Sequence, residues 1–297
     1  MQVIKVTPRG YCYGVVDAIE MAKRLAKSDN VRRPIYILGM VVHNQHVVDM
    51  LHAEYGIITL DGADRLELLK QVPDGSTVLF TAHGISPEVR AAAMERDLDC
   101  YDATCPDVTR THDLVRELCA AGYHIIYIGR AGHPEAAGIL GEAPDRIHLV
   151  QREEDLLRLK DKLPPGVAIA VTTQTTMSQW DTQELIDKIK AMYPGVLVKN
   201  EICLATQERQ EAVVAAAAQA DVVIVVGDRR SHNSTRLVEV VRRRAGKPAY
   251  LVDGVEEITP EMLAGCRVAA VTSGSSTPTY LTRQVISYLE QYGEENG

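Results

Sequence analysis

The chain has 297 residues, of which 46% are hydrophobic and 24% charged, so it can bury the core of a folded protein of two or three domains. Its net charge of −8 disfavours a protein dedicated to nucleic acid, and no apolar run is long enough to cross a membrane. The N-terminus begins with a strand pattern and has no secretory signal, which predicts a cytoplasmic protein. In that reducing compartment the six cysteines are expected to be ligands, nucleophiles or core residues.

Short apolar runs typical of strands alternate with helical patterns along the whole chain. The first third has runs at 3–7, 35–38, 57–60 and 77–81, the second at 100–103, 125–129, 147–150 and 167–172, and the last at 196–199, 222–227, 249–252 and 268–272. This alternation is typical of parallel sheets. We predict an α/β fold of three similar units with mostly parallel four-stranded sheets, at residues 1–103, 104–200 and 201–297.

Polar residues recur in step with these strands. Cys12, Cys105 and Cys203 each follow the first strand of a third and precede its first helix. The second strand of each third leads into a polar cluster, which contains His43 in the first third, His133 and Glu135 in the second, and Ser231 and Asn233 in the last. The last strand of each third leads into another polar cluster, which contains His83, Thr175 and Ser276 in the same order of thirds. Such a repeat indicates three copies of one unit. Because ligands bind beyond the carboxyl ends of strands in open α/β sheets, we predict that these residues form one site.

The three repeated cysteines are candidate metal ligands. Each lies at a strand-to-helix turn, where the helix dipole stabilises a thiolate. No C-x-x-C pair is present, so the usual zinc-ribbon and ferredoxin spacings are absent. Thiolates are the usual ligands of iron–sulfur clusters, and three of them would leave one iron of a 4Fe-4S cluster open for catalysis. The remaining Cys100, Cys119 and Cys266 are expected to be core residues.

The polar clusters predict an anion site with a proton donor. His43, His83 and His133, together with Thr175, Ser231, Asn233 and Ser276, offer many hydrogen-bond donors. Such a pocket suits a small anion such as a phosphate or diphosphate. Glu135 is the one carboxylate in these clusters, and we expect it to donate protons rather than only to favour a helix dipole.

Motifs around these residues cover nearly the whole chain in order. They are PRGYC at 8–12, VVHN at 41–44, AHG at 82–84, DATCP at 102–106, GHPE at 132–135, TQTT at 173–176, CLAT at 203–206 with Arg209 and Gln210, and Asn233. Together they resemble the 4-hydroxy-3-methylbut-2-enyl diphosphate reductase family, which catalyses the last step of the non-mevalonate isoprenoid pathway. The resemblance implies reductive dehydroxylation of this allylic diphosphate to isopentenyl and dimethylallyl diphosphate.

The resemblance also implies a structure and roles for the site residues. The three units would form a pseudo-threefold trefoil around one 4Fe-4S cluster, held by Cys12, Cys105 and Cys203 with an open iron site. The diphosphate would bind the residues matching His43, His83, His133, Ser231, Asn233 and Ser276. Thr175 and Glu135 would lie near the substrate hydroxyl, with Glu135 delivering protons. A ferredoxin or flavodoxin would supply electrons, and neither nucleic acid nor a membrane is an expected partner.

Other interpretations stay open at this point. The three cysteines could serve a zinc-dependent hydrolase, another iron–sulfur or zinc enzyme acting on a small diphosphate, or a non-catalytic iron–sulfur sensor. His232 stands where the family often has a small residue, so it could contact the diphosphate or point away. The basic run at 242–244 is either a solvated helix face or a docking patch for an acidic redox partner.

Overall fold

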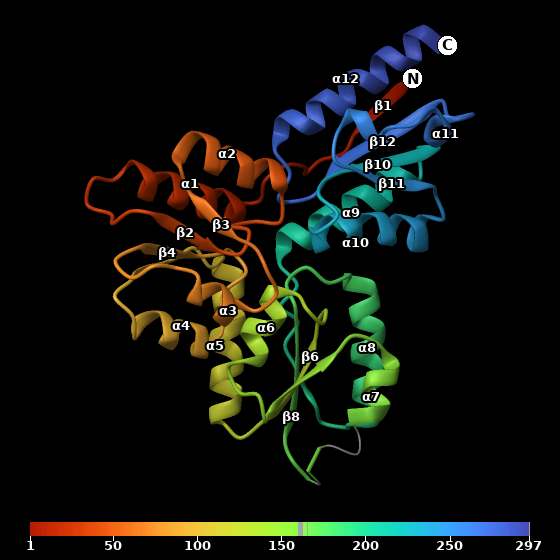
Figure 1. The fold of residues 1–297 in the computed structure, drawn as a ribbon. Coiled ribbons are helices and arrows are strands. Elements are labelled where there is room, and N and C mark those ends of the chain that lie inside the picture. The colour runs from red at the N-terminus through yellow and green to blue at the C-terminus, as the bar shows by residue number, and fades with distance from the viewer. Residues whose placement is uncertain (160–162, 165, 297) are drawn as a thin grey trace. The chain divides into compact units, whose positions relative to one another are not determined.

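The protein is described from a computed structural model, in which residues 1–159, 163–164 and 166–296 are placed. Strands and helices alternate along the chain (Figure 1). The strands form three four-stranded sheets. Every strand pairing within the described residues is parallel; these pairings join neighbouring strands in all three sheets. The prediction of three α/β units with parallel four-stranded sheets is therefore confirmed.

One sheet comes from residues 35–102. Its strand order is β3 (Ile58–Leu60), β2 (Ile35–Leu38), β4 (Thr77–Phe80) and β5 (Asp99–Asp102). The helices of this part of the chain are α1 (Tyr13–Lys27), α2 (Gln45–Tyr55), α3 (Arg65–Lys70) and α4 (Pro87–Met94).

A second sheet has the order β7 (Ile147–Val150), β6 (His124–Ile128), β8 (Ile169–Thr173) and β9 (Leu197–Val198). The helices in this part of the chain are α5 (Pro106–Ala120), α6 (Pro134–Leu140), α7 (Glu153–Leu159) and α8 (Gln179–Met192).

The third sheet has the order β11 (Ala249–Val252), β10 (Val222–Val226), β12 (Val268–Ser273) and β1 (Gln2–Lys5). Its surrounding helices are α9 (Leu204–Ala217), α10 (His232–Val240), the π-helical turn η1 (Val241–Ala245), the 3-10 turn η2 (Val255–Glu257), α11 (Pro260–Leu263) and α12 (Thr279–Asn296). The N-terminal strand thus pairs with β12, where Gln2 lies opposite Val268, and completes a sheet built from the last third.

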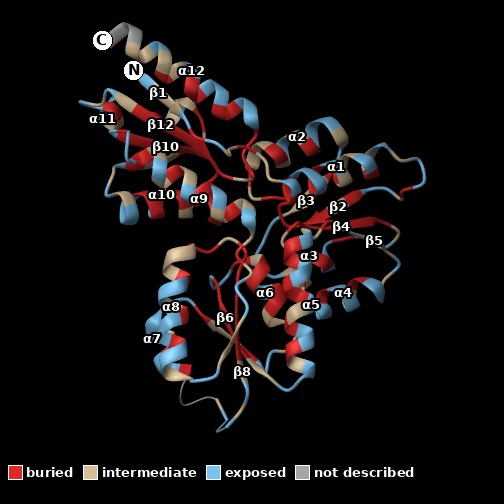
Figure 2. Ribbon diagram, turned by 180° about the vertical axis from the view of Figure 1, so that it is seen from behind, coloured by how far each residue is buried: buried red, intermediate tan, exposed pale blue. Residues whose placement is uncertain are grey.

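The central strands form the core because they are apolar on both faces. All five residues of β10 are buried, as are all four residues of β4, and Figure 2 shows the strands as mostly buried between helices with exposed outer faces. Strands covered on both faces need such continuous apolar runs. Among the described residues, no helix combines the length and apolar character needed to cross a membrane.

The chain divides into two compact units. The terminal unit contains the described residues of Met1–Val15, His43–Val47 and Cys203–Gly297, and with them the sheet of β1, β10, β11 and β12. The central unit contains those of Val16–Val42 and Val48–Ile202, with the other two sheets.

Candidate functional site

The predicted site residues follow strands at their carboxyl ends. In every sheet the strand order places the second and fourth strands of a repeat side by side, and the third strand at an edge. Site residues come after the two central strands of each sheet and after the strand at one edge, which is β1, β5 or β9. None directly follows β3, β7 or β11, the strands at the opposite edge. The chain continues from the two central strands toward opposite edges of each sheet, and ligands of parallel α/β sheets bind at such a topological switch point.

A hydrogen-bonded polar cluster lies in the terminal unit. The Ser276 hydroxyl donates to the backbone carbonyl of His43 at 3.1 Å and lies 3.3 Å from the Ser231 hydroxyl. Asn233 accepts a hydrogen bond from the backbone N–H of Ser275 at 2.9 Å through its side-chain oxygen. Ser231, Asn233 and Ser276 are all buried, so the structure brings these predicted anion-binding residues together.

Local sequence explains the placement of Ser231. It is the N-cap of α10, where its hydroxyl accepts from the backbone N–H of Ser234. His232 is the first residue of that helix; its ring is buried, and its Nε2 lies 3.3 Å from Nη2 of Arg236 one turn along. The N-terminus of α10 therefore offers Ser231 and Asn233 beside helical N–H groups, an arrangement that favours anions.

Two of the three candidate cysteines also belong to the terminal unit. Cys203 is the N-cap residue of α9, and its sulfur makes no capping hydrogen bond to the helix backbone. The backbone N–H of Cys12 donates to the carbonyl of Ser275 at 3.2 Å, which ties its loop to the polar cluster. Both thiols act electrostatically on Arg209, so both lie near that guanidinium.

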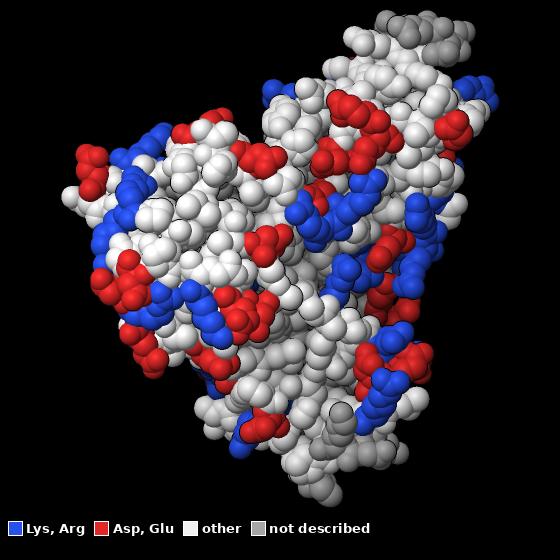
Figure 3. Space-filling model, viewed as in Figure 1, with Lys and Arg blue, Asp and Glu red and all other residues white. Residues whose placement is uncertain are grey.

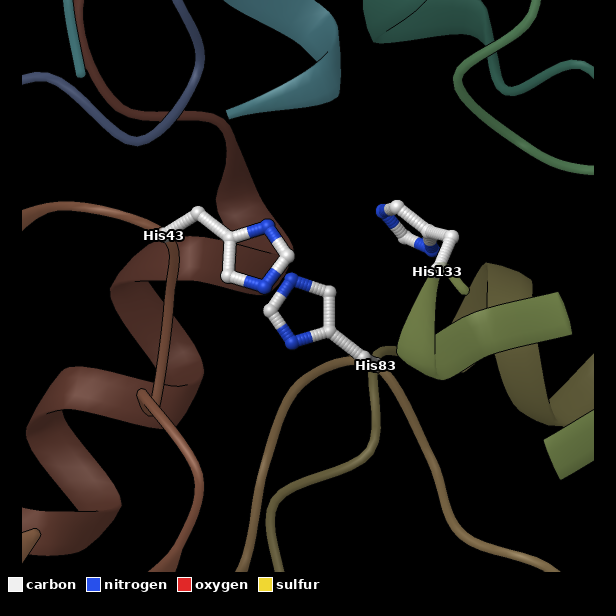
Figure 4. Close-up of side chains that lie close together, drawn as sticks. All are labelled: His43, His83 and His133. Atoms are coloured by element: carbon white, nitrogen blue, oxygen red, sulfur yellow. The ribbon is translucent and has the colours of Figure 1, made fainter. Parts of the chain in front are cut away.

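The third cysteine and two histidines belong to the central unit. Cys105 begins α5 with Pro106 at the first helical position, and its backbone N–H donates to the carbonyl of Ala82 at 3.0 Å. His83, the next residue after Ala82, lies beside His133 with ring centroids 5.6 Å apart and planes at 83°; both are among the histidines drawn in Figure 4. The structure therefore brings Cys105, His83 and His133 to neighbouring loops.

A packed histidine supports the loop that carries His83. His112, on α5, is 6% exposed, and its Nδ1 lies 2.5 Å from a carboxylate oxygen of Glu142. Gly84 has φ +77°, and a Cβ there would lie 2.9 Å from Nε2 of His112. Only glycine suits this position, because both the backbone conformation and the close approach of the imidazole disfavour a side chain.

Glu135 and Thr175 form a buried acid site in the central unit. The Thr175 backbone N–H donates to Oε1 of Glu135 at 2.7 Å, and its hydroxyl donates to Oε2 at 2.8 Å. Burial raises the pKa of the Glu135 carboxyl to about 7, although the Thr175 hydrogen bonds oppose that shift. A carboxyl with this pKa can both hold and release a proton at neutral pH.

Other charged and titratable groups also act on Glu135. Asp107 on α5 raises its pKa, whereas the Tyr127 hydroxyl on β6 lowers it. Tyr127 is fully buried; its hydroxyl makes no regular hydrogen bond in the described structure but is close enough to Glu135 to affect that pKa. On its own helix, the backbone N–H of Glu135 donates to Nδ1 of His133 at 3.2 Å. This bond makes Nδ1 an acceptor and leaves the imidazole proton on Nε2.

The other three cysteines lie outside these clusters. None of the six cysteines forms a disulfide, and Cys100, Cys119 and Cys266 each pack against a different hydrophobic cluster. Burial raises the pKa of each of these three thiols, which favours the protonated form. All three are only half-buried, so they pack at the margin of the core rather than inside it.

Basic and acidic side chains are mixed on the face of the molecular surface drawn in Figure 3. Exposed ion pairs such as Arg32 with Asp97 at 2.8 Å are examples of this mixing. Binding of an anion by a chain with a net charge of −8 therefore depends on local donors such as Ser231, Asn233 and the histidines.

Comparison with known proteins decides the family. Residues 3–290 match the family described as LytB protein. The chain belongs to the LytB family. A protein from Symbiobacterium thermophilum named 4-hydroxy-3-methylbut-2-enyl diphosphate reductase is 58% identical over 295 residues, which covers 99% of each chain. Another of that name from Brevibacillus brevis is 56% identical over 296 residues and covers all of this chain and 94% of its own.

Solved structures agree with the LytB assignment. The E-1-hydroxy-2-methyl-but-2-enyl-4-diphosphate reductase of Plasmodium falciparum aligns with a TM-score of 0.90 at 33% identity, over 97% of this chain and 87% of that one. A structure described as (E)-4-hydroxy-3-methyl-but-2-enyl diphosphate reductase, the terminal enzyme of the non-mevalonate pathway, aligns with a TM-score of 0.67 at 30% identity. It covers 98% of this chain and all of its own.

The LytB family implies an iron–sulfur cluster, and the cysteines of this chain fit one. Cys105 and Cys203 are N-cap residues whose sulfurs make no capping hydrogen bond to the helix backbone, and the Cys203 sulfur lies 3.2 Å from the hydroxyl oxygen of Thr206. The buried guanidinium of Arg209 interacts electrostatically with Cys12 and Cys203. The candidate donor set is thus three cysteine sulfurs, the ligand type of iron–sulfur clusters.

Sequence reasoning assigned no role to Arg209 or Tyr127, although both lie close to predicted site residues. A signal for Arg209 is present in the helical pattern of α9. Its buried stripe contains Thr206, Arg209 and Gln210, where an ordinary amphipathic helix would have apolar residues. Tyr127 gives no comparable signal, because a tyrosine within an apolar strand reads as an ordinary core residue.

Proposed function

We propose that this protein reduces 4-hydroxy-3-methylbut-2-enyl diphosphate to isopentenyl and dimethylallyl diphosphate, the last step of the non-mevalonate isoprenoid pathway. The observation that carries this proposal is the buried Glu135–Thr175 pair, a proton donor with a pKa of about 7 in a chain 58% identical to a protein named for this activity. The reaction consumes two electrons and two protons. The allylic C–O bond breaks, the hydroxyl leaves as water, and a C–H bond forms at one end of the allyl group.

The cysteines Cys12, Cys105 and Cys203 would hold one 4Fe-4S cluster with an open iron site. When bound, the cluster supplies the electrons for the reaction one at a time. The protein's own contribution is to hold these cysteines at the starts of helices or in hydrogen-bonded loops, and to pack the other three thiols against hydrophobic clusters.

Buried hydrogen-bond donors would hold the diphosphate. In the terminal unit, Ser231, Asn233 and Ser276 lie in one hydrogen-bonded network with the backbone of His43. In the central unit, His83 and His133 lie side by side, and His133 keeps its proton on Nε2. Hydrogen bonds from such donors to an anion are charge-assisted and therefore strong.

Glu135 would deliver protons near the hydroxyl of the substrate. Burial keeps about half of the Glu135 carboxyls protonated near neutral pH, which suits a general acid. Thr175 fixes the orientation of the carboxyl, because its two donors bind both carboxylate oxygens. The hydroxyl of Thr175 can reverse its hydrogen bond when Glu135 changes protonation, since a hydroxyl both donates and accepts.

A ferredoxin or flavodoxin is the electron donor that we propose, and a cytoplasmic location is part of the same proposal. The electron donor is proposed because the reaction consumes electrons, and the location because such donors are expected in the cytoplasm. The basic run at 242–244 is one place to test docking, because its neutralisation should weaken the salt dependence of the reduction rate if an acidic partner binds there.

Anaerobic turnover of the hydroxylated diphosphate with a chemical reductant tests the function directly. The expected result is a brown protein that contains iron and sulfide and forms both isopentenyl and dimethylallyl diphosphate. A colourless, zinc-loaded protein that hydrolyses a diphosphate would support the zinc hydrolase instead. A brown protein that forms no product under these conditions would support the sensor.

A further inference from the structure

Arg209 connects the segments that carry Cys12 and Cys203. It lies on α9, is 3% exposed, and donates from Nη2 to the carbonyl of Gly10 at 2.8 Å, two residues before Cys12. From Nη1 it donates to the carbonyl of Ala205 at 2.9 Å, two residues after Cys203. One guanidinium therefore binds the backbone just before Cys12 and the backbone just after Cys203.

The segment before Cys12 is otherwise held in place by its backbone. Gly10 has φ +78°, and its N–H donates to the hydroxyl of Ser273 at 2.8 Å. With its N–H bound to Ser273 and its carbonyl bound to Arg209, Gly10 has little freedom to move. The position of the following Cys12 is therefore coupled to Arg209.

The charge on Arg209 has sulfur neighbours. The guanidinium is buried, and Cys12, Cys203 and Glu208 act electrostatically on it. An arginine nevertheless remains charged, and a buried charge is costly unless an opposite charge lies close by. The Nε–H is also buried and has no acceptor within the described residues. These observations indicate that an anionic, hydrogen-bond-accepting group belongs beside this guanidinium.

We infer that Arg209 is a positioning residue for the iron–sulfur cluster, which aligns Cys12 and Cys203 and supplies a fixed positive charge that favours the reduced cluster. This inference rests on the proposed function, because it requires that these cysteines bind a cluster. Its physical basis is that reduction adds one negative charge, which a nearby cation stabilises strongly in a poorly polarisable interior. Net charge and hydrogen bonds to sulfur are general determinants of cluster potentials.

The reduction potential of the bound cluster is the measurement that tests this role. We expect Arg209→Gln and Arg209→Met to lower the potential, so that the ratio of reduced to oxidised cluster at a fixed solution potential falls by about tenfold, or about 59 mV for a one-electron couple. Arg209→Lys keeps the charge but cannot donate a planar pair of hydrogen bonds. It should keep a potential closer to the native one and lose some cluster occupancy.

A matched control exists in the central unit. Arg96 also bridges two backbone carbonyls, those of Leu69 at 2.7 Å and Val72 at 2.5 Å, and its ion-pair partner is Asp74. Arg96→Gln removes a similar bridge without removing charge near Cys12 or Cys203. It should leave the potential unchanged.

Each outcome decides the inference. The potential is measured by redox titration with electron paramagnetic resonance, which reports only the cluster-loaded fraction, so lower occupancy alone does not move it. A native potential in Arg209→Gln would overturn the charge role. If the Gln and Met variants hold no cluster, a loaded Arg209→Lys with a near-native potential supports the role of charge, and an Arg209→Lys that is equally empty overturns it.

The proposed function fails separately. If anaerobically prepared wild-type protein contains no iron–sulfur cluster, or has one but forms no product, the reductase assignment is wrong whatever the Arg209 variants do. If the wild type is active and contains the cluster, but the Arg209 variants have the same reduction potential as the wild type, only the inference about Arg209 is wrong.

Discussion

Thr175 binds both carboxylate oxygens of Glu135, one through its backbone N–H at 2.7 Å and the other through its hydroxyl at 2.8 Å. These two contacts orient a carboxyl that is 1% exposed and whose pKa burial raises to about 7. A protonated acid that is held in one orientation suits proton delivery better than a flexible one.

Replacing Glu135 by glutamine should remove proton delivery while preserving the shape of the site. Glutamine can accept the Thr175 N–H through its oxygen and donate to the Thr175 hydroxyl through its amide. We expect kcat to fall by about 100-fold or more, the lower end of the usual general acid contribution. Turnover is measured anaerobically, and an unchanged visible absorption spectrum is the control that the cluster is intact. Near-normal turnover would rule out Glu135 as the proton donor.

The reaction rate should depend on pH through Glu135. A general acid must be protonated, so activity is expected below its pKa of about 7 and should be lost as the pH rises above that value. The slope should approach a tenfold loss in kcat/KM for each pH unit. The profile is measured with a chemical reductant, to keep a protein donor from contributing its own pH dependence. A wild-type profile without this loss, or the same loss in the residual activity of Glu135→Gln, would contradict the assignment.

Folding stability should also respond to the Glu135 carboxyl. Its raised pKa means that the unfolded chain releases this proton near the ordinary value of 4.5, whereas the folded protein retains it up to about pH 7. The carboxyl therefore destabilises the fold progressively as the pH rises through this range, by up to about 3 kcal/mol above it. Glutamine has no such charge.

The melting temperatures of wild type and Glu135→Gln, prepared with matched cluster content, provide the measurement. We expect Glu135→Gln to gain stability relative to wild type between about pH 5 and about pH 8. The same difference between the two proteins at both pH values would show that Glu135 does not have a raised pKa.

Loss of one cysteine ligand should remove the cluster without unfolding the protein. Cys203 makes no side-chain capping bond at the start of α9, so Cys203→Ala should cost the helix little. We expect little or no iron and sulfide in this variant and no turnover. Cys119→Ala is the matched control, because Cys119 is half-buried and packs against a hydrophobic cluster; it should keep the cluster. A cluster of native absorbance in Cys203→Ala would exclude this cysteine as a ligand.

His133 has a structural and a proposed binding role that two substitutions can separate. Its Nδ1 accepts the backbone N–H of Glu135 at the start of α6, and we propose that Nε2 binds the diphosphate. Asparagine can replace the cap but not the Nε2 donor. His133→Asn should therefore raise KM by about tenfold or more, given the usual strength of a hydrogen bond to a charged group, with little change in melting temperature.

His133→Ala should show the same rise in KM and also a lower melting temperature, because it loses the cap as well. If His133→Asn has a native KM, His133 does not contribute a donor to the substrate. The comparison is made with the same reductant and cluster content in both variants.

The repeat in the sequence predicted much of the architecture, and one strand shows where local pattern was insufficient. Every apolar run assigned as a strand overlaps one in the structure, because short apolar runs that alternate with helical patterns are typical of parallel sheets. The pattern did not specify which sheet the first strand joins. Gln2–Lys5 pairs with β12, more than 260 residues later, and strand pairing over such a distance depends on the folded chain.

The sequence by itself determined the types and order of the site residues: Cys12, Cys105 and Cys203 at equivalent strand-to-helix turns, polar clusters after the central strands, and a single acid at Glu135. Only the tertiary structure decided how these groups behave. Burial against distant elements sets the pKa of Glu135, Thr175 orients it from another strand end, and Arg209 contacts Gly10 across most of the chain. Spacing in the sequence can place a residue at a turn. The desolvation of its side chain and the orientation of a charged group depend on neighbours that only folding brings together.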